Sequence, residues 1–129
     1  MNTILVEVSV GELLDKISIL EIKKEKIKDS EKLKFINDEY EVLKDQLDKN
    51  VKSNEKIDKL FQSLKEINAK LWIIEDDKRL CEKNSDFSEK FIKLSRDVHF
   101  LNDDRAKIKL EINQHTGSKI KEIKKYTNY

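Results

Sequence analysis

Helix-breaking residues are nearly missing from this chain. Its 129 residues include no proline and only two glycines, Gly11 and Gly117. Proline removes a helical hydrogen bond, and glycine costs about 1 kcal/mol in a helix interior, so a chain that almost lacks both favours long helices. Apolar residues also recur at spacings of three and four along most of the sequence, which is the period of one helix face. We therefore expect an all-α protein.

The N-terminal part departs from this helical pattern. Residues 3–10 are rich in β-branched side chains and indicate a short extended segment. Ser9 and Glu12 then form a Ser-x-x-Glu capping box, which predicts that a helix begins there. Residues 3–8 have strand character but no second strand to pair with. We expect them either to dock on the helices or to pair with the same segment of a second subunit.

Three weak breaks divide the helical remainder. The first is Asp29-Ser30, which contains neither glycine nor proline and is either a turn or a kink; we favour the turn. The second is the polar stretch 48–55, which we interpret as a loop. The third covers residues 84–86, where Asp86 and Glu89 repeat the capping pattern.

These segments predict an elongated antiparallel bundle of two helical hairpins, with four helices in all. Three long helices are the alternative if residues 29–30 only kink the chain. We expect one helical domain over residues 1–129, with an extended segment at 1–8 and a tail at 118–129. Gly117 is a plausible stop for the last helix, and the tail is either a short helix or a docked end.

Composition limits the classes of partner. Lysine and arginine number 27 and aspartate and glutamate number 26, so the chain lacks the one-signed charge of a general nucleic-acid or membrane-surface binder. Cys81 is the only cysteine, which suits a reducing, cytoplasmic setting. No basic start followed by an apolar run marks a signal peptide, and no stretch approaches 18 apolar residues. We expect no cofactor, with a homodimer or another protein as the partner.

Four polar residues fall on the apolar stripes of the two longest predicted helices. They are Asn68, Glu75, Asn102 and Arg105. A bundle core does not accept such groups without partners. We therefore expect all four to be mostly buried and joined by hydrogen bonds or ion pairs.

Glu75 lies four residues before Arg79 and close to Trp72, which suggests a partly buried carboxylate with a cation beside it. The alternative is a surface ion pair and a core tryptophan. Asp76 and Asp103 could join Glu75 around Mg²⁺. However, consecutive acids on one helix, such as Glu75 and Asp76, cannot all face one point, so we expect no metal site. We expect Glu75 to meet Arg79, Arg105 or Lys16 instead. Cys81 is expected to be a buried thiol.

Several runs resemble a bacterial family of unknown function that consists of small all-helical proteins. The runs are residues 8–23 (VSVGELLDKISILEIK), 71–72 with 75–77, 86–87, 102–105, and 111–113 with 116–118. Genes of that family are often described near glycosyltransferase and surface-polysaccharide loci. The resemblance implies a fold and a shared polar set without an assigned activity; the implied set is Lys16, Glu21, Glu75, Asp76, Asn102, Asp103 and Arg105.

Three functions remain open on these observations. The first, which we favour, is a non-catalytic binding or assembly protein, for which the resemblance implies a role as an accessory to glycan biosynthesis. The second is a site for a small anion or sugar phosphate at Glu75, Asn102 and Arg105. The third is a Mg²⁺-dependent hydrolase of nucleotides or phosphosugars. No residue is predicted to be catalytic, and the candidate ligand-binding residues are Lys16, Glu21, Trp72, Glu75, Asp76, Arg79, Asn102, Asp103 and Arg105.

Overall fold

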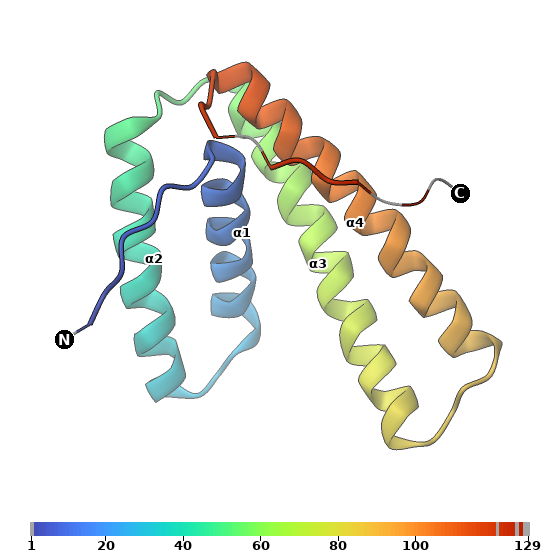
Figure 1. Ribbon diagram of the computed structural model, residues 1–129. Helices are drawn as coiled ribbons and strands as arrows, with labels where there is room; N and C mark the ends of the chain where they lie inside the picture. The colour runs from blue at the N-terminus through green and yellow to red at the C-terminus, as the bar shows by residue number, and fades with distance from the viewer. Residues whose placement is uncertain (1, 121, 126, 128–129) are drawn as a thin grey trace.

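The computed structural model describes residues 2–120, 122–125 and 127 (Figure 1). Its helices are α1 (Val10–Lys26), α2 (Ser30–Asn50), α3 (Glu55–Lys83) and α4 (Glu89–Thr116). Helix α1 packs against each of the other three, α3 packs against α4, and the main packing partner of α2 is α1. The described residues contain no strand, so the predicted all-α bundle is confirmed.

Side chains that bond to free backbone N–H groups explain where three of the helices begin. Ser9 Oγ accepts a hydrogen bond from the backbone N–H of Glu12 at 3.0 Å, as the capping box predicted. Asp29 Oδ1 accepts one from Lys32 N at 3.0 Å, and Asn54 Oδ1 accepts one from Ile57 N at 2.9 Å. Asp29 therefore begins a new helix, and the break at residues 29–30 is a turn between α1 and α2.

The connection between α3 and α4 differs from the expected capping pattern. Helix α4 begins at Glu89, its N-cap residue is Ser88, and the Ser88 side chain makes no capping bond. Asp86 instead accepts a hydrogen bond from the backbone N–H of Ser88 at 3.1 Å. The predicted Asp86–Glu89 cap is therefore wrong, because the chain makes a further turn before the helix starts. At the other end of α4, Gly117 adopts φ 65°, the left-handed conformation expected of a helix stop.

The apolar core lies where α1, α3 and α4 meet. Leu14, Ile57, Leu64 and Ile112 form a buried cluster there. Helices α3 and α4 continue well past this cluster toward their connecting turn (Figure 1). Two packed helices cannot cover all their apolar residues, and Leu80 on this extension is 50 % exposed. None of the described helices combines the length and apolar character that crossing a bilayer requires.

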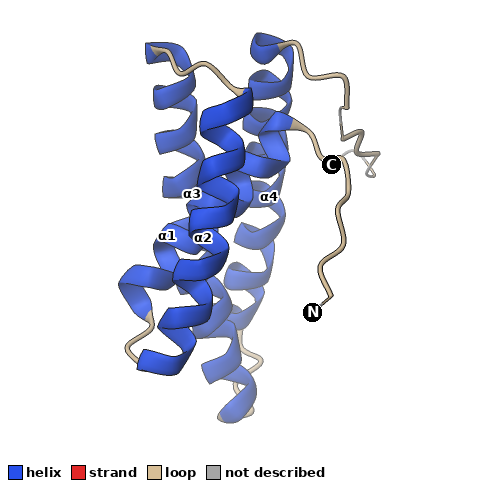
Figure 2. Cartoon of the chain, turned by 90° about the vertical axis from the view of Figure 1, so that its left-hand side faces the viewer, coloured by secondary structure: helices blue, strands red, loops and turns tan. Residues whose placement is uncertain are grey.

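Both ends of the chain lie outside the helices. Figure 2 shows the N-terminal segment clear of the bundle, and Ile4 and Leu5 are 86 % and 96 % exposed. The expectation that this segment docks on the helices is wrong, while pairing with a second copy stays a prediction. The described residues of the tail, 118–120, 122–125 and 127, form no helix and pass beside α4. Lys121 and Tyr126 lie outside the described residues.

Gly11 allows the first turn of α1 to approach α4 closely. A Cβ atom at this position would lie 2.6 Å from the carbonyl oxygen of Lys109 and 3.0 Å from Asn113 Oδ1. We expect Gly11→Ala to destabilise the protein by about 1–3 kcal/mol, because helix backbone has to move apart, even though alanine is the better helix former. Urea denaturation measures this change.

Gly117→Ala is the matched control. A Cβ atom there would meet nothing within 4 Å, so only the strain of φ 65° remains, which is about 1 kcal/mol. If Gly11→Ala unfolds at a higher urea concentration than the parent, the close contact between α1 and α4 is not a constraint.

Candidate functional site

The centre of the polar region is a buried carboxylate on α1. Asp15 is 1 % exposed. Arg105 of α4 donates Nε–H to Asp15 Oδ1 at 3.0 Å and Nη2–H to Oδ2, while Asn68 Nδ2 of α3 donates to Oδ1 at 2.8 Å. Three helices are therefore joined through one side chain. A bidentate pair of this kind is among the strongest hydrogen-bonded arrangements in proteins.

Asn68 is shared between two residues of α1. Its Nδ2 also donates to Ser18 Oγ at 2.8 Å, and the Ser18 hydroxyl donates to the carbonyl oxygen of Asp15 at 2.7 Å. Every buried side-chain nitrogen and oxygen in the described part of the chain has a hydrogen-bond partner. The buried side of the region is therefore a closed network that stabilises the packing.

Lys109 forms a second layer, one helical turn after Arg105. Its Nζ lies 2.6 Å from Glu12 Oε2, 2.9 Å from Glu122 Oε2 and 3.7 Å from Asp15 Oδ2. Burial alone would lower the pKa of Lys109, but its hydrogen bonds to Glu12 and Glu122 outweigh burial, and the pKa is raised. The pKa of Arg105 is also raised, chiefly by its hydrogen bonds to Asp15. Both groups are held as fixed positive charges.

The last turn of α4 and the residues just after it close the start of α1. Asn113 Oδ1 accepts a hydrogen bond from the backbone N–H of Gly11 at 2.7 Å, and Ser118 Oγ accepts one from Val10 N at 3.3 Å. The first N–H groups of a helix have no partner within the helix, so these bonds satisfy donors that would otherwise be buried unpaired.

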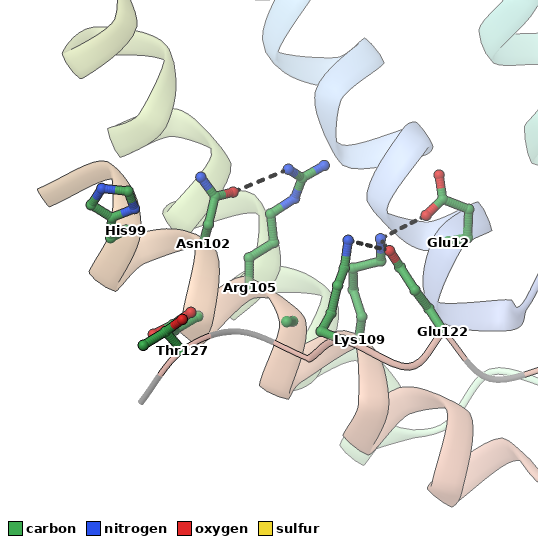
Figure 3. A pocket seen from close by; sticks show the side chains of 10 residues that line it. Glu12, His99, Asn102, Arg105, Lys109, Glu122 and Thr127 are labelled. Carbon is green, nitrogen blue, oxygen red and sulfur yellow. Dashed lines mark hydrogen bonds and ion pairs between the residues drawn. The ribbon is translucent and has the colours of Figure 1, made fainter. Parts of the chain in front are cut away.

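A cavity of about 610 Å³ lies on the open side of this network (Figure 3). Helix α1, helix α4 and the C-terminal segment (Ser118–Thr127, as far as it is described) form its walls. Its lining residues are mostly polar or charged: Glu12, His99, Asn102, Asp103, Arg105, Ala106, Lys109, Glu122, Lys124 and Thr127.

Arg105 and Asn102 direct N–H groups toward this cavity that are available to a ligand. Among the described residues, Arg105 Nη1 reaches only Asn102 Oδ1, at a long 3.4 Å. That contact uses the carbonyl of Asn102 and leaves its amide nitrogen without a partner among the described residues (Figure 3). The outer edge of Arg105 and the Asn102 amide therefore offer N–H groups to an acceptor in the cavity.

Three of the predicted ligand-binding residues, Asn102, Asp103 and Arg105, line this cavity together. Two other predicted residues lie on α1 outside the lining. Lys16 is exposed, and its Nζ lies 3.8 Å from Glu12 Oε1. Glu21 lies on another face of α1, where its Oε1 is 3.1 Å from Lys65 Nζ and its Oε2 accepts a hydrogen bond from the Tyr40 hydroxyl at 3.3 Å. The structure does not bring the whole predicted set into one place.

The other four predicted residues, Trp72, Glu75, Asp76 and Arg79, lie on the extension of α3. Glu75, Asp76 and Arg79 are exposed and Trp72 is partly buried. The expectation that Glu75 is buried is wrong, because its stripe position lies two turns past Asn68, where α3 extends beyond α1 (Figure 1). No ion pair joins Glu75 to Arg79, Arg105 or Lys16 within the described residues, so that expectation is also wrong.

The acids considered as Mg²⁺ ligands are also separated from one another. Asp103 lines the cavity, whereas Glu75 and Asp76 are exposed on the extension of α3. The described residues contain no group of three or more His, Cys, Asp or Glu side chains that could hold a metal ion. Cys81 is a buried free thiol, as expected.

Asp15, Glu12, Lys109 and Glu122 were missed by the sequence reasoning. Lys109 could have been found, because it lies four residues after Arg105 and therefore on the same face of α4. Asp15 gave a weaker signal, since it lies directly beside the buried Leu14 on α1. Nothing in the spacing of the C-terminal segment indicates that Glu122 returns to α4.

Removing the Arg105 guanidinium takes away the bidentate partner of the buried Asp15. We expect Arg105→Ala to lower the free energy of unfolding by about 3–5 kcal/mol, the usual effect of removing one partner of a buried pair. Arg79→Ala is the control, because Arg79 is exposed on α3, and it should change stability by less than about 0.5 kcal/mol. Equal urea midpoints for the two variants would show that the Asp15–Arg105 pair does not hold the helices together.

The ion pairs of Glu122, which hold one wall of the cavity, depend on pH. Hydrogen bonds from Lys124 and then Lys109 lower its pKa from 4.5 to about 2. Because the lowered value belongs to the folded protein, the ion pairs of Glu122 stabilise the fold above pH 4.5 and are lost as the pH falls from 4.5 toward about 2. NMR titration of its side-chain carboxyl carbon should show this low pKa, and Lys124→Met should raise it. A parent pKa near 4.5 would mean that Glu122 is not held by these lysines.

Comparison with known proteins adds a family but no activity. No curated protein and no solved structure matches the chain. A family model described as "Family of unknown function (DUF6165)" matches residues 4–129, which include all four helices and every lining residue of the cavity. The chain therefore belongs to this family of unknown function.

Proposed function

We propose that this protein is a non-catalytic binding protein, and that it holds a small anionic molecule, such as a sugar phosphate, in the cavity beside α4. One observation carries the proposal. The Arg105 guanidinium is fixed on one side by the buried Asp15 and turns its Nη1, with the Asn102 amide, toward a cavity of about 610 Å³.

The fixed arginine suits an anion. A planar guanidinium donates to phosphate or carboxylate oxygens in a defined direction, which a flexible lysine does not. Asp15 already holds the Nε and Nη2 edge, so Arg105 loses little further side-chain freedom when an anion binds. Affinity is gained in this way because the cost of ordering the side chain has been met during folding.

The size and lining of the cavity favour a molecule larger than a bare ion. Ligand sites in proteins commonly enclose about 300–1,000 Å³, and this cavity lies inside that range. His99, Asp103 and Thr127 add polar groups that suit the hydroxyls of a sugar. A sugar phosphate is also a ligand that an accessory protein of glycan biosynthesis, the role implied by the family resemblance, would meet.

The shifted pKa values favour binding over proton transfer. The pKa values of Arg105 and Lys109 are raised, and that of Glu122 is lowered to about 2. All three shifts stabilise the charged form, whereas a general acid or base works best with a pKa near the working pH. These groups act as fixed charges, which position a ligand without exchanging protons with it.

The test is a calorimetric titration with inorganic phosphate, a hexose 1-phosphate and the uncharged hexose. We expect the hexose phosphate to bind most tightly, phosphate to bind more weakly, and the hexose alone to give no measurable binding. Ala106→Leu should weaken binding of the hexose phosphate, because the added carbon atoms project into the cavity without removing any hydrogen bond.

Ala69→Leu is the matched control, because Ala69 is the other alanine of the chain, is partly buried in α3, and does not line the cavity. It should bind the hexose phosphate as the parent does, provided that circular dichroism shows both variants folded. Equal binding by the Ala106→Leu and Ala69→Leu variants would place any anion site elsewhere on the molecule.

A further inference from the structure

The cavity already contains an anionic group from the protein itself. Lys109 is 9 % exposed at its side chain and has three carboxylate neighbours, Glu12, Asp15 and Glu122. Glu12 and Asp15 belong to α1 and are placed by helix packing. Glu122 alone comes from a segment without regular secondary structure, and its Oε2 lies 2.9 Å from Lys109 Nζ (Figure 3).

Glu122 has few other attachments. Among the described residues, its other ion-pair partner is Lys124 of the same C-terminal segment, whose Nζ lies 2.5 Å from Glu122 Oε1. The Glu122 side chain is 37 % exposed, whereas that of Asp15 is 2 % exposed. The Glu12 side chain is also 32 % exposed, but it is attached to α1, so Glu122 is the carboxylate whose backbone can move away without displacing a helix.

The charged side chains around the cavity have no positive excess. Arg105, Lys109 and Lys124 provide three positive side chains, while Glu12, Asp103 and Glu122 on the lining and Asp15 behind Arg105 provide four negative ones. An anion that simply added to this set would increase the excess of negative charge in a partly enclosed space, which is unfavourable. An anion that exchanged with the Glu122 carboxylate would remove one negative charge as it added its own.

We propose that Glu122 is a built-in occupant of the anion position on Lys109, and that the phosphate or carboxylate of the ligand displaces it. This inference rests on the proposed function, since it assigns the second contact of the same anion. The ligand group then lies between Arg105 and Lys109, and its arrival releases the C-terminal segment from α4. Binding is thereby converted into a change at the end of the chain.

Two measurements on the full chain test the exchange, with the hexose 1-phosphate as the probe. Glu122→Gln keeps the shape of the side chain but removes its charge, so the variant should bind the probe about tenfold more tightly than the parent, the effect of losing one charge-assisted competitor. Glu111→Gln, on an exposed glutamate of α4 that does not line the cavity, should leave the affinity unchanged.

The second measurement is the rate at which trypsin cleaves the C-terminal segment, followed by mass spectrometry at constant ionic strength. The probe should accelerate cleavage of the parent, while Glu122→Gln should be cleaved quickly with or without it. Equal affinities of parent and Glu122→Gln, with an unchanged cleavage rate, would overturn the exchange and leave the anion site standing. Absence of binding to both proteins would overturn the anion site as well.

Discussion

The charge of Asp15 is the constraint on which the packing of three helices depends. A carboxylate that is 1 % exposed needs close hydrogen-bond partners, and it obtains them from α3 through Asn68 and from α4 through Arg105. Apolar contacts such as Leu14 with Leu64 and Ile112 supply much of the burial, but they are non-directional. The hydrogen bonds of Asp15 require each helix to lie at one height and one rotation.

The same network determines what the cavity presents. Because Asp15 holds one edge of the guanidinium, the other edge of Arg105 has a fixed direction, and Lys109 is placed one turn further along α4. The buried face of the polar region is therefore complete, while its outer face keeps donors for a ligand. Structural and binding roles are divided between two sides of the same residues, and a variant such as Arg105→Ala would disturb both at once.

Much of the fold could be predicted from the sequence, because it depends on local signals. The lack of proline, the apolar periodicity, the Ser9 cap, the turn at Asp29 and the Gly117 stop each involve residues close together in the chain. The burial of Asn68 was predicted correctly for the same reason. The exposure of Glu75 was not predicted, because the apolar periodicity of α3 continues past the point where α1 covers it. The periodicity of one helix does not show how long its neighbour is. Lys109 and Glu122 are brought together by the return of the C-terminal segment, which leaves no periodic pattern.

The closure of α1 by residues near the other end of the chain bears on how the protein folds during synthesis. Helix α1 is made first, yet the partners of Gly11 and Val10 are Asn113 and Ser118, more than 100 positions later. Until α4 leaves the ribosome, α1 carries a carboxylate at position 15 that cannot be buried at low cost, so premature collapse around Leu14 and Ile17 is disfavoured. The residue that aligns the finished helices therefore obtains its full set of partners only when the last helix is available.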